Sequence, residues 1–157
     1  MTAAMVRARA TRLIPRAAIG VAPEQATLVN IETVMWVDAP RRRTLPTVTI
    51  LGRDVHITIR LAHVTWDFGD GRSRTTNSAG TPYDRPCDTK MCPGYFGHVY
   101  RHTGRRQITA TATWTASFTV GGGRPVAIPG TVAGPTAGAD IHVKEARGVL
   151  VPNPGER

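Results

Sequence analysis

Two cysteines and two histidines form the most concentrated group of potential ligands in the sequence. Cys87 and Cys92 are the only cysteines of the chain, and His98 and His102 follow them closely. Two thiolates and two imidazoles form a set that zinc accepts in a tetrahedral site. However, the interval between Cys92 and His98 is far shorter than the ~12–15 residues that separate the two pairs in finger-type sites. This spacing leaves zinc as an alternative beside a disulfide or two free thiols.

Two carboxylates, Asp67 and Asp70, lie close enough in sequence to be weighed for acid–base chemistry or calcium binding. They belong to the run Trp66-Asp67-Phe68-Gly69-Asp70-Gly71. The two glycines allow positive φ, and Asp70 can accept hydrogen bonds from neighbouring amides. Calcium takes about six to eight oxygen ligands, and two carboxylates supply few of them. We therefore interpret the run as a structural turn, with calcium binding as the alternative.

No other pattern of residues indicates catalysis or a cofactor. Ser73 and Ser78 lack the G-x-S-x-G context of a nucleophile. The glycine run at 121–123 is followed by neither a helix pattern nor the Lys-Ser/Thr of a phosphate loop. The sequence therefore predicts a protein that is not an enzyme and that holds no cofactor.

The elements that would position these residues are short strands. Gln107 to Val120 alternates apolar and polar residues along its whole length, as expected of a strand with one buried and one wet face. Val55 to Leu61 alternates likewise, and the parity then shifts to Ala62, Val64 and Trp66. A bulge near 61–62 explains that shift. Further candidate strands lie at Leu28 to Val37, Thr47 to Leu51 and Asp140 to Glu145.

This texture predicts one all-β domain in a chain of 157 residues. Residues 1–24 are rich in Ala and Arg and contain two prolines, so we expect a poorly ordered basic segment there. The sandwich would span residues 25–151, and residues 152–157 would form a C-terminal tail. No apolar run approaches the ~18 residues of a membrane-spanning helix.

Two motifs in order resemble the signature of the PKD domain (polycystic kidney disease domain). The first is the W-D-F-G-D-G run at 66–71. The second is His98-Val99-Tyr100, followed by Gly104 and by Ile108 at the head of the long alternating strand. The resemblance implies an immunoglobulin-like, two-sheet antiparallel β-sandwich of about seven strands. It also implies a non-catalytic role, because PKD modules share no catalytic residues.

Two departures from the PKD pattern stand out. Arg106 occupies a position where the family usually has an aromatic residue. The connection near 72–97 is longer than usual and contains both cysteines. Because PKD modules are found in exported bacterial proteins, the resemblance favours a Cys87–Cys92 disulfide over zinc and free thiols. A disulfide there would order the insertion.

The resemblance places the protein outside the cell or on its surface, as a spacer or a module that binds protein or carbohydrate. No signal peptide is visible, because the apolar stretch after the basic start, Ala17 to Ala22, is too short. Recognition on a rigid sandwich usually lies in its loops. We expect contacts from the insertion, where Tyr83, Tyr95 and Phe96 could stack on sugars or anchor a protein partner.

Charge supports a second hypothesis of another class. Twenty basic against eleven acidic residues give a net charge of +9, and the densest cluster is Arg41-Arg42-Arg43. Such a charge favours anionic partners. The alternative is therefore a cytoplasmic accessory protein that binds nucleic acid or another polyanion, with reduced thiols. No aromatic residues interleave these arginines to stack on bases, so no specific nucleic acid is expected.

Overall fold

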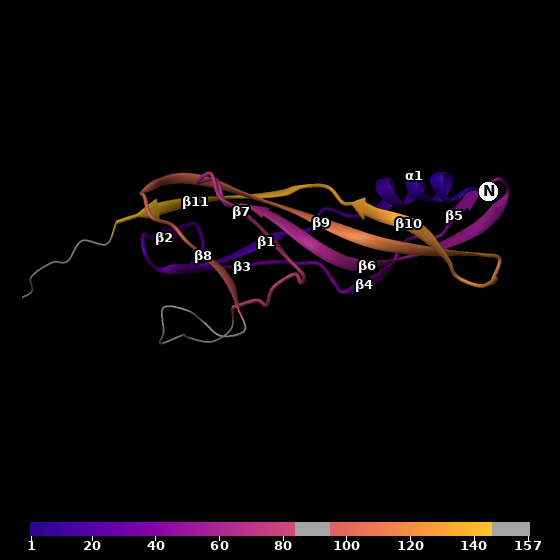
Figure 1. The fold of residues 1–157 in the computed structure, drawn as a ribbon, viewed down its shortest axis with the longest axis horizontal. Helices are drawn as coiled ribbons and strands as arrows, with labels where there is room; N and C mark the ends of the chain where they lie inside the picture. Colours follow the sequence, from indigo (N-terminus) through magenta and orange to yellow (C-terminus); the bar gives the residue numbers. More distant parts are fainter. Residues whose placement is uncertain (84–94, 146–157) are drawn as a thin grey trace, which may run out of the picture.

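The computed structural model describes residues 1–83 and 95–145, and these residues form an all-β structure with one short helix. Figure 1 shows an elongated molecule built on two long strands that run through most of its length. The elements are α1 (Ala3–Leu13), β1 (Ile19–Ala22), β2 (Ala26–Leu28), β3 (Glu32–Val37), β4 (Arg42–Thr44), β5 (Val48–Ile50), β6 (Arg53–Asp67), β7 (Ser73–Thr76), β8 (Phe96–Val99), β9 (Gly104–Val120), β10 (Val126–Ala133) and β11 (Ala137–Lys144).

The long strands β6 and β9 pair antiparallel from Val55↔Val120 to Asp67↔Thr109. Their register shifts between Leu61 and His63, which confirms the predicted bulge. The extra residue keeps the apolar side chains of β6 on one face although their parity in the sequence changes. One face of this ribbon is therefore apolar over its full length, while the other is rich in threonine.

The apolar face is covered by a second sheet at one end, which we call the sandwich end. There the sheet β1-β3-β8 packs against β6, β9 and β11, as Figure 1 shows. The core between the two sheets contains Met35, Trp66, Tyr100 and Ile108, all fully buried. A two-sheet β-sandwich was the predicted fold, and this end confirms it.

The other end, the helix end, is covered by α1 instead of a second sheet. Val6 and Ala10 lie one helical turn apart and are both fully buried against the core that contains Ile57, Trp114 and Phe118. Thr2 caps the helix by accepting a hydrogen bond from the Met5 amide through its side chain. This packing differs from the poorly ordered segment expected over 1–24.

The helix is also tied to β10 through Arg7. Its guanidinium donates hydrogen bonds to the carbonyl oxygens of Pro129 and Thr131. Arginine suits this role because its several N–H donors point in a fixed fork. An arginine of the basic N-terminal segment therefore serves as a structural contact.

The sheet topology is richer than predicted. The described residues hold eleven strands instead of about seven, and eight of them form one strongly curled sheet. Within it β2 pairs parallel with β11, so the sheet is not purely antiparallel. Short edge strands such as β4 and β7 account for much of the difference, because three or four residues give little periodicity to detect. No helix in the described part is long and apolar enough to cross a membrane.

Candidate functional site

The predicted turn at 66–71, the signature turn, is held by its own carboxylates. Asp67 Oδ1 accepts a hydrogen bond from the Gly69 amide at 2.9 Å, and Asp70 Oδ1 accepts one from the Arg72 amide at 3.1 Å. Gly69 has φ +79°, and a Cβ there would lie 2.6 Å from the carbonyl oxygen of Gln107. The turn therefore packs against the β9 backbone so closely that only glycine fits.

The two halves of the signature meet through a short hydrogen bond and a ring stack. His98 Nε2 lies 2.7 Å from Asp70 Oδ2, and the side chains are only 12% and 15% exposed. The imidazole stacks on the Phe68 ring, with centroids 3.9 Å apart and planes at 6°. It also meets the Tyr100 ring edge-on at 4.7 Å. Residues 28 positions apart in sequence thus form one cluster.

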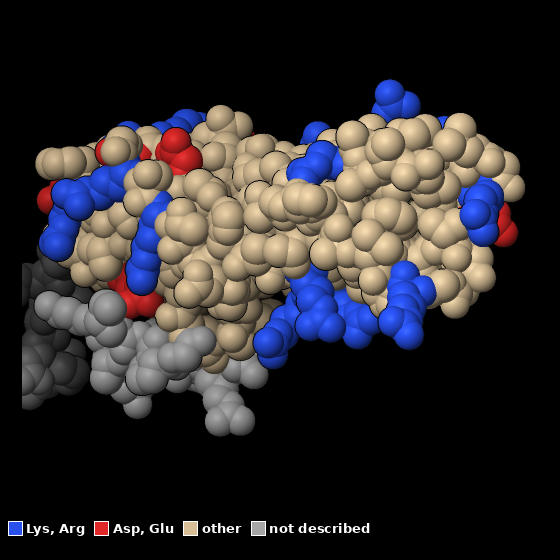
Figure 2. Space-filling view, turned by 45° about the vertical axis from the view of Figure 1, so that its right-hand side comes forward, with Lys and Arg blue, Asp and Glu red and all other residues tan. Residues whose placement is uncertain are grey.

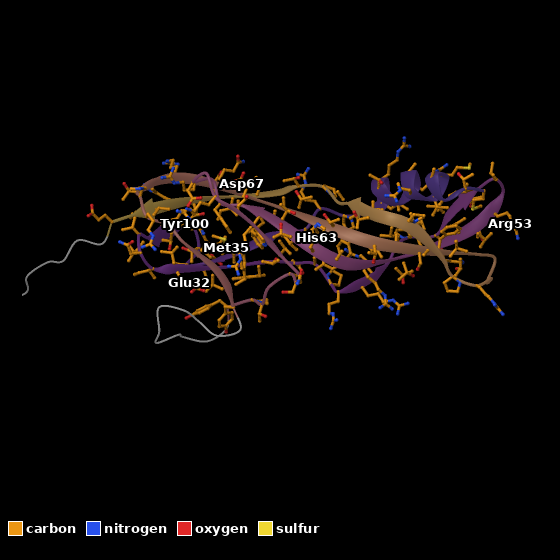
Figure 3. The ribbon with its side chains drawn as sticks, in the orientation of Figure 1. Glu32, Met35, Arg53, His63, Asp67 and Tyr100 are labelled. Atoms are coloured by element: carbon orange, nitrogen blue, oxygen red, sulfur yellow. The ribbon has the colours of Figure 1, made fainter. Side chains whose placement is uncertain are left out.

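Tyr100 completes this cluster from inside the core. Its hydroxyl donates a hydrogen bond to the carbonyl oxygen of Phe68 at 2.8 Å, and its side chain is fully buried. Figure 3 shows Tyr100 at the sandwich end, near Glu32 and Met35. Burial raises the pKa of Tyr100, the charge of Asp70 raises it further, and Arg106 partly offsets both. The phenol therefore stays protonated and keeps its hydrogen bond.

The pKa of Asp70 moves the other way. Burial opposes ionisation of its carboxyl, but the hydrogen bond from His98, the Arg72 amide and the charge of His98 together lower the pKa below its ordinary 3.8. A carboxylate held in this way serves the turn, because its oxygens are engaged within the fold. The interpretation of 66–71 as a structural turn agrees with this geometry.

The described residues test only part of the zinc and calcium hypotheses. Cys87 and Cys92 lie outside the described residues, so the zinc set and the disulfide are not described. Within the described ranges no group of three His, Cys, Asp or Glu side chains is placed to hold a metal ion. Both carboxylates considered for calcium accept the hydrogen bonds given above.

The predicted contact residues come together beside the three-stranded sheet. Tyr83 and Tyr95 lie with ring centroids 5.4 Å apart at 46°, and Tyr83 is 37% exposed. Phe96 packs inward against Trp66 at 5.0 Å, and the Arg74 guanidinium lies 5.1 Å above its ring. Tyr95 and Phe96 therefore come from adjacent positions but face different surroundings.

A hollow of about 290 Å³ lies against Tyr95 and Phe96, and we call it the aromatic hollow. Tyr83 adjoins it through its ring contact with Tyr95. It combines ring surface with hydroxyl groups from the segment after β7 and with charged groups on β3 and β7. Its described lining consists of Glu32, Arg74, Ser78, Gly80, Thr81, Tyr95, Phe96 and Gly97. Sequence reasoning found the aromatic residues but missed Glu32, because β3 is brought to β8 only by the fold: Glu32 pairs with Val99.

A second hollow, of about 340 Å³, lies beside the signature turn, and we call it the arginine hollow. It is formed where the turn meets the connection from β8 to β9. Its lining consists of Gly69, Asp70, Arg72, Tyr100, Arg101, His102 and Arg106.

A third feature is a group of arginines at the β4 edge of the eight-stranded sheet. Arg42 of β4 pairs with Arg60 of β6, and Arg60 pairs with Thr115 of β9. With Arg41 and Arg43 they form what we call the arginine edge, and all four arginines are exposed. Figure 2 shows Lys and Arg side chains gathered along the lower edge of the molecule, in the region of β4. Sequence reasoning found the triplet but not Arg60.

Comparison with known proteins supplies no relative that could decide among these features. No protein-family model, curated protein or solved structure matches the chain. We therefore infer the function of the chain from the geometry of these three surfaces.

Proposed function

We propose that the chain is a non-catalytic interaction module of the PKD type, acting outside the cytoplasm and binding protein or carbohydrate through the aromatic hollow. The signature residues support a structural use of the motif. Asp67, Asp70, His98 and Tyr100 all direct their polar groups at one another or at the backbone. These contacts support a structural role for the four side chains.

The observation that carries the proposal is the Tyr83–Tyr95 pair beside the aromatic hollow. Binding sites for small ligands are concave, with ring surface and a few placed polar groups. Tyrosine suits such sites because a large rigid ring ends in a polar hydroxyl. Here Ser78 and Thr81 add hydroxyls, and Arg74 adds a charge held over the Phe96 ring.

Sedimentation of the full chain with insoluble polysaccharides, together with capture on immobilised cell-surface proteins, tests this proposal. Tyr83→Ala and Tyr95→Ala should each weaken binding about tenfold or more, since interface tyrosines commonly cost above 1.4 kcal/mol when truncated. Val126→Ala is the matched control, because Val126 is an apolar residue of β10 that is 50% exposed. Equal loss with Val126→Ala, or no loss with either tyrosine variant, would remove the aromatic hollow as the contact site.

The compartment has its own test in the cysteines. A Cys87–Cys92 disulfide belongs to the proposal, because such bridges persist in oxidising compartments. Intact-mass measurement of protein from its native host should show a gain of two hydrogens on reduction. Two free thiols in freshly isolated protein would contradict the extracytoplasmic assignment.

The arginine edge favours polyanion binding as the second candidate function. No ion pair joins its four arginines to a carboxylate within the described residues. The face beside it offers hydroxyls from Thr58, Thr115 and Ser117, and phosphate oxygens are commonly contacted by Arg, Ser and Thr together. Binding to polyphosphate or DNA that falls steeply with salt, and is lost in an Arg42→Gln/Arg60→Gln variant, would establish this function.

A further inference from the structure

The arginine hollow collects positive charge that the described part of the chain does not neutralise. Arg72, Arg101 and Arg106 reach it from the signature turn, the β8–β9 connection and β9. Asp70 is the only carboxylate among the described residues of its lining, and it is already engaged by His98 and by the Arg72 amide. No described carboxylate forms an ion pair with any of the three arginines.

Two of the three arginines of this hollow donate hydrogen bonds to neutral acceptors. Arg101 Nη1 donates to Asn30 Oδ1 at 3.2 Å, and Arg106 Nη2 donates to the carbonyl oxygen of Thr103 at 3.3 Å. A guanidinium carries five N–H donors. Each of these arginines therefore keeps donors available for an anion, and each keeps its full charge.

Arg106 is the least solvated member of the group. It lies in register with the buried Ile141 and precedes Ile108 and Ala110 on the inward-facing row of β9. Its Nε atom is buried and has no hydrogen-bond partner. Its stem therefore lies beside the sandwich core, and its side chain lines the hollow. An arginine that has lost part of its hydration binds oxyanions more strongly, because less water must be displaced.

We propose that the arginine hollow is a binding site for a small molecule that bears a phosphate group. Three guanidinium groups and His102 offer more donors than the two oxygens of a carboxylate can accept. A phosphate monoester presents three strongly accepting oxygens and nearly two negative charges. Arginine forks bind such oxygens in bidentate pairs. A volume of about 340 Å³ is large enough for a group of sugar size beside the phosphate.

A neighbouring hollow of about 440 Å³ shares Arg106 but is less suited to an anion. Asp140 contributes a carboxylate to its lining, beside Arg105 and His142. A carboxylate that accepts no side-chain hydrogen bond within the described residues would repel a phosphate, whereas Asp70 in the arginine hollow is held by His98 and the Arg72 amide. The proposal is therefore confined to the arginine hollow.

Titration of the isotope-labelled full chain with inorganic phosphate, followed by nuclear magnetic resonance, tests the site. The amide signals of Gly69, Arg72 and His102 should shift together and saturate. The affinity for glucose 6-phosphate, compared with that for inorganic phosphate, shows whether the site also holds a group beyond the phosphate. Glucose should shift none of these signals. Glucuronate should bind at least tenfold more weakly than phosphate, and equal binding would overturn the assignment to phosphate.

Variants decide whether the arginines carry the binding. Arg106→Gln should weaken phosphate binding at least tenfold, and Arg106→Lys, which keeps the charge but not the fork, should lie between. Because Arg106 is partly buried, Arg72→Gln/Arg101→Gln on exposed positions provides an independent test with the same expected loss. Arg53→Gln/Arg124→Gln, at two exposed positions outside the lining of the hollow, is the control and should leave binding unchanged. Absence of saturation, or equal loss in that control, would overturn the proposal without affecting the one for the aromatic hollow.

Discussion

At the scale of single residues, the signature turn makes a prediction about pH. Asp70→Asn removes a carboxylate that accepts two hydrogen bonds, one of them from an imidazole, and should cost about 1–3 kcal/mol of unfolding free energy at pH 7. The lowered pKa of Asp70 means that this stabilisation is present above its ordinary 3.8 and is lost as the pH falls through the folded-state value. Urea denaturation at several pH values should show the gap between wild type and variant closing below about pH 4.

Asp38→Asn is the matched control for this series. Asp38 is exposed, and its side chain makes no hydrogen bond in the described structure. The unfolding free energy of the Asp38→Asn variant should therefore stay within about 0.5 kcal/mol of the wild-type value across the series. A gap for Asp70→Asn that keeps its size into acid would show that the carboxylate does not stabilise the turn by its charge.

Tyr100 makes a second prediction at this scale. Tyr100→Phe leaves the carbonyl oxygen of Phe68 without its 2.8 Å partner in a buried place, which should cost about 1–2 kcal/mol. Tyr83→Phe removes the same hydroxyl from an exposed ring and should change stability little. If chemical denaturation gives the same loss of unfolding free energy for both variants, the buried hydrogen bond makes no net contribution to stability.

The residues of the signature could be predicted because their local chemistry reveals their role. Two glycines and two aspartates in six positions indicate a tight turn, and the structure shows one. The sequence did not predict in the same way which side chains would contact that turn. The stacking of His98 on Phe68 and the position of Glu32 beside Gly97 depend on which strands become neighbours.

At the scale of elements, α1 was the largest difference from expectation, although the sequence contains a signal for it. Val6, Ala10 and Leu13 follow helical spacing, but alanine and arginine around them gave a composition typical of a tail. The sequence did not show which surface this helix would pack against. The apolar face of β6 and β9 extends beyond the three-stranded sheet, and α1 covers that remainder.

This role of α1 predicts the effect of deleting the two γ-methyl groups of one buried valine. Val6→Ala removes fully buried apolar surface between the helix and the sheet and should cost about 1–3 kcal/mol. Met5→Ala, on the neighbouring position, should cost about 0.5 kcal/mol or less, because Met5 is 37% exposed. Thermal unfolding of both variants checks the difference. If Val6→Ala has no greater effect than Met5→Ala, the helix does not stabilise the domain.

At the scale of the whole molecule, two separate cores share the same pair of strands. The core of the helix end and the core of the sandwich end both use β6 and β9, and both touch Ala39 and Leu61. The covering elements differ, but the pairing of β6 with β9 continues across the bulge. Loss of that pairing at one end would unpair backbone groups at the other, so we expect one cooperative transition.

The tryptophans are placed to test this cooperativity. Trp66 is fully buried in the core of the sandwich end, and Trp114 is 3% exposed in the core of the helix end. A Trp36→Phe/Trp114→Phe variant reports on the first core, and a Trp36→Phe/Trp66→Phe variant reports on the second. Fluorescence during urea denaturation of each variant, compared with circular dichroism of the same sample, should give coincident transitions.

Adding Val6→Ala to both variants makes the test directional. If the ends are coupled, weakening the helix end should lower the midpoint reported by Trp66 as much as the one reported by Trp114. If they unfold as separate units, only the Trp114 signal should move. That result would mean that the long ribbon joins two independent units, and that α1 contributes nothing to the sandwich end where both hollows lie.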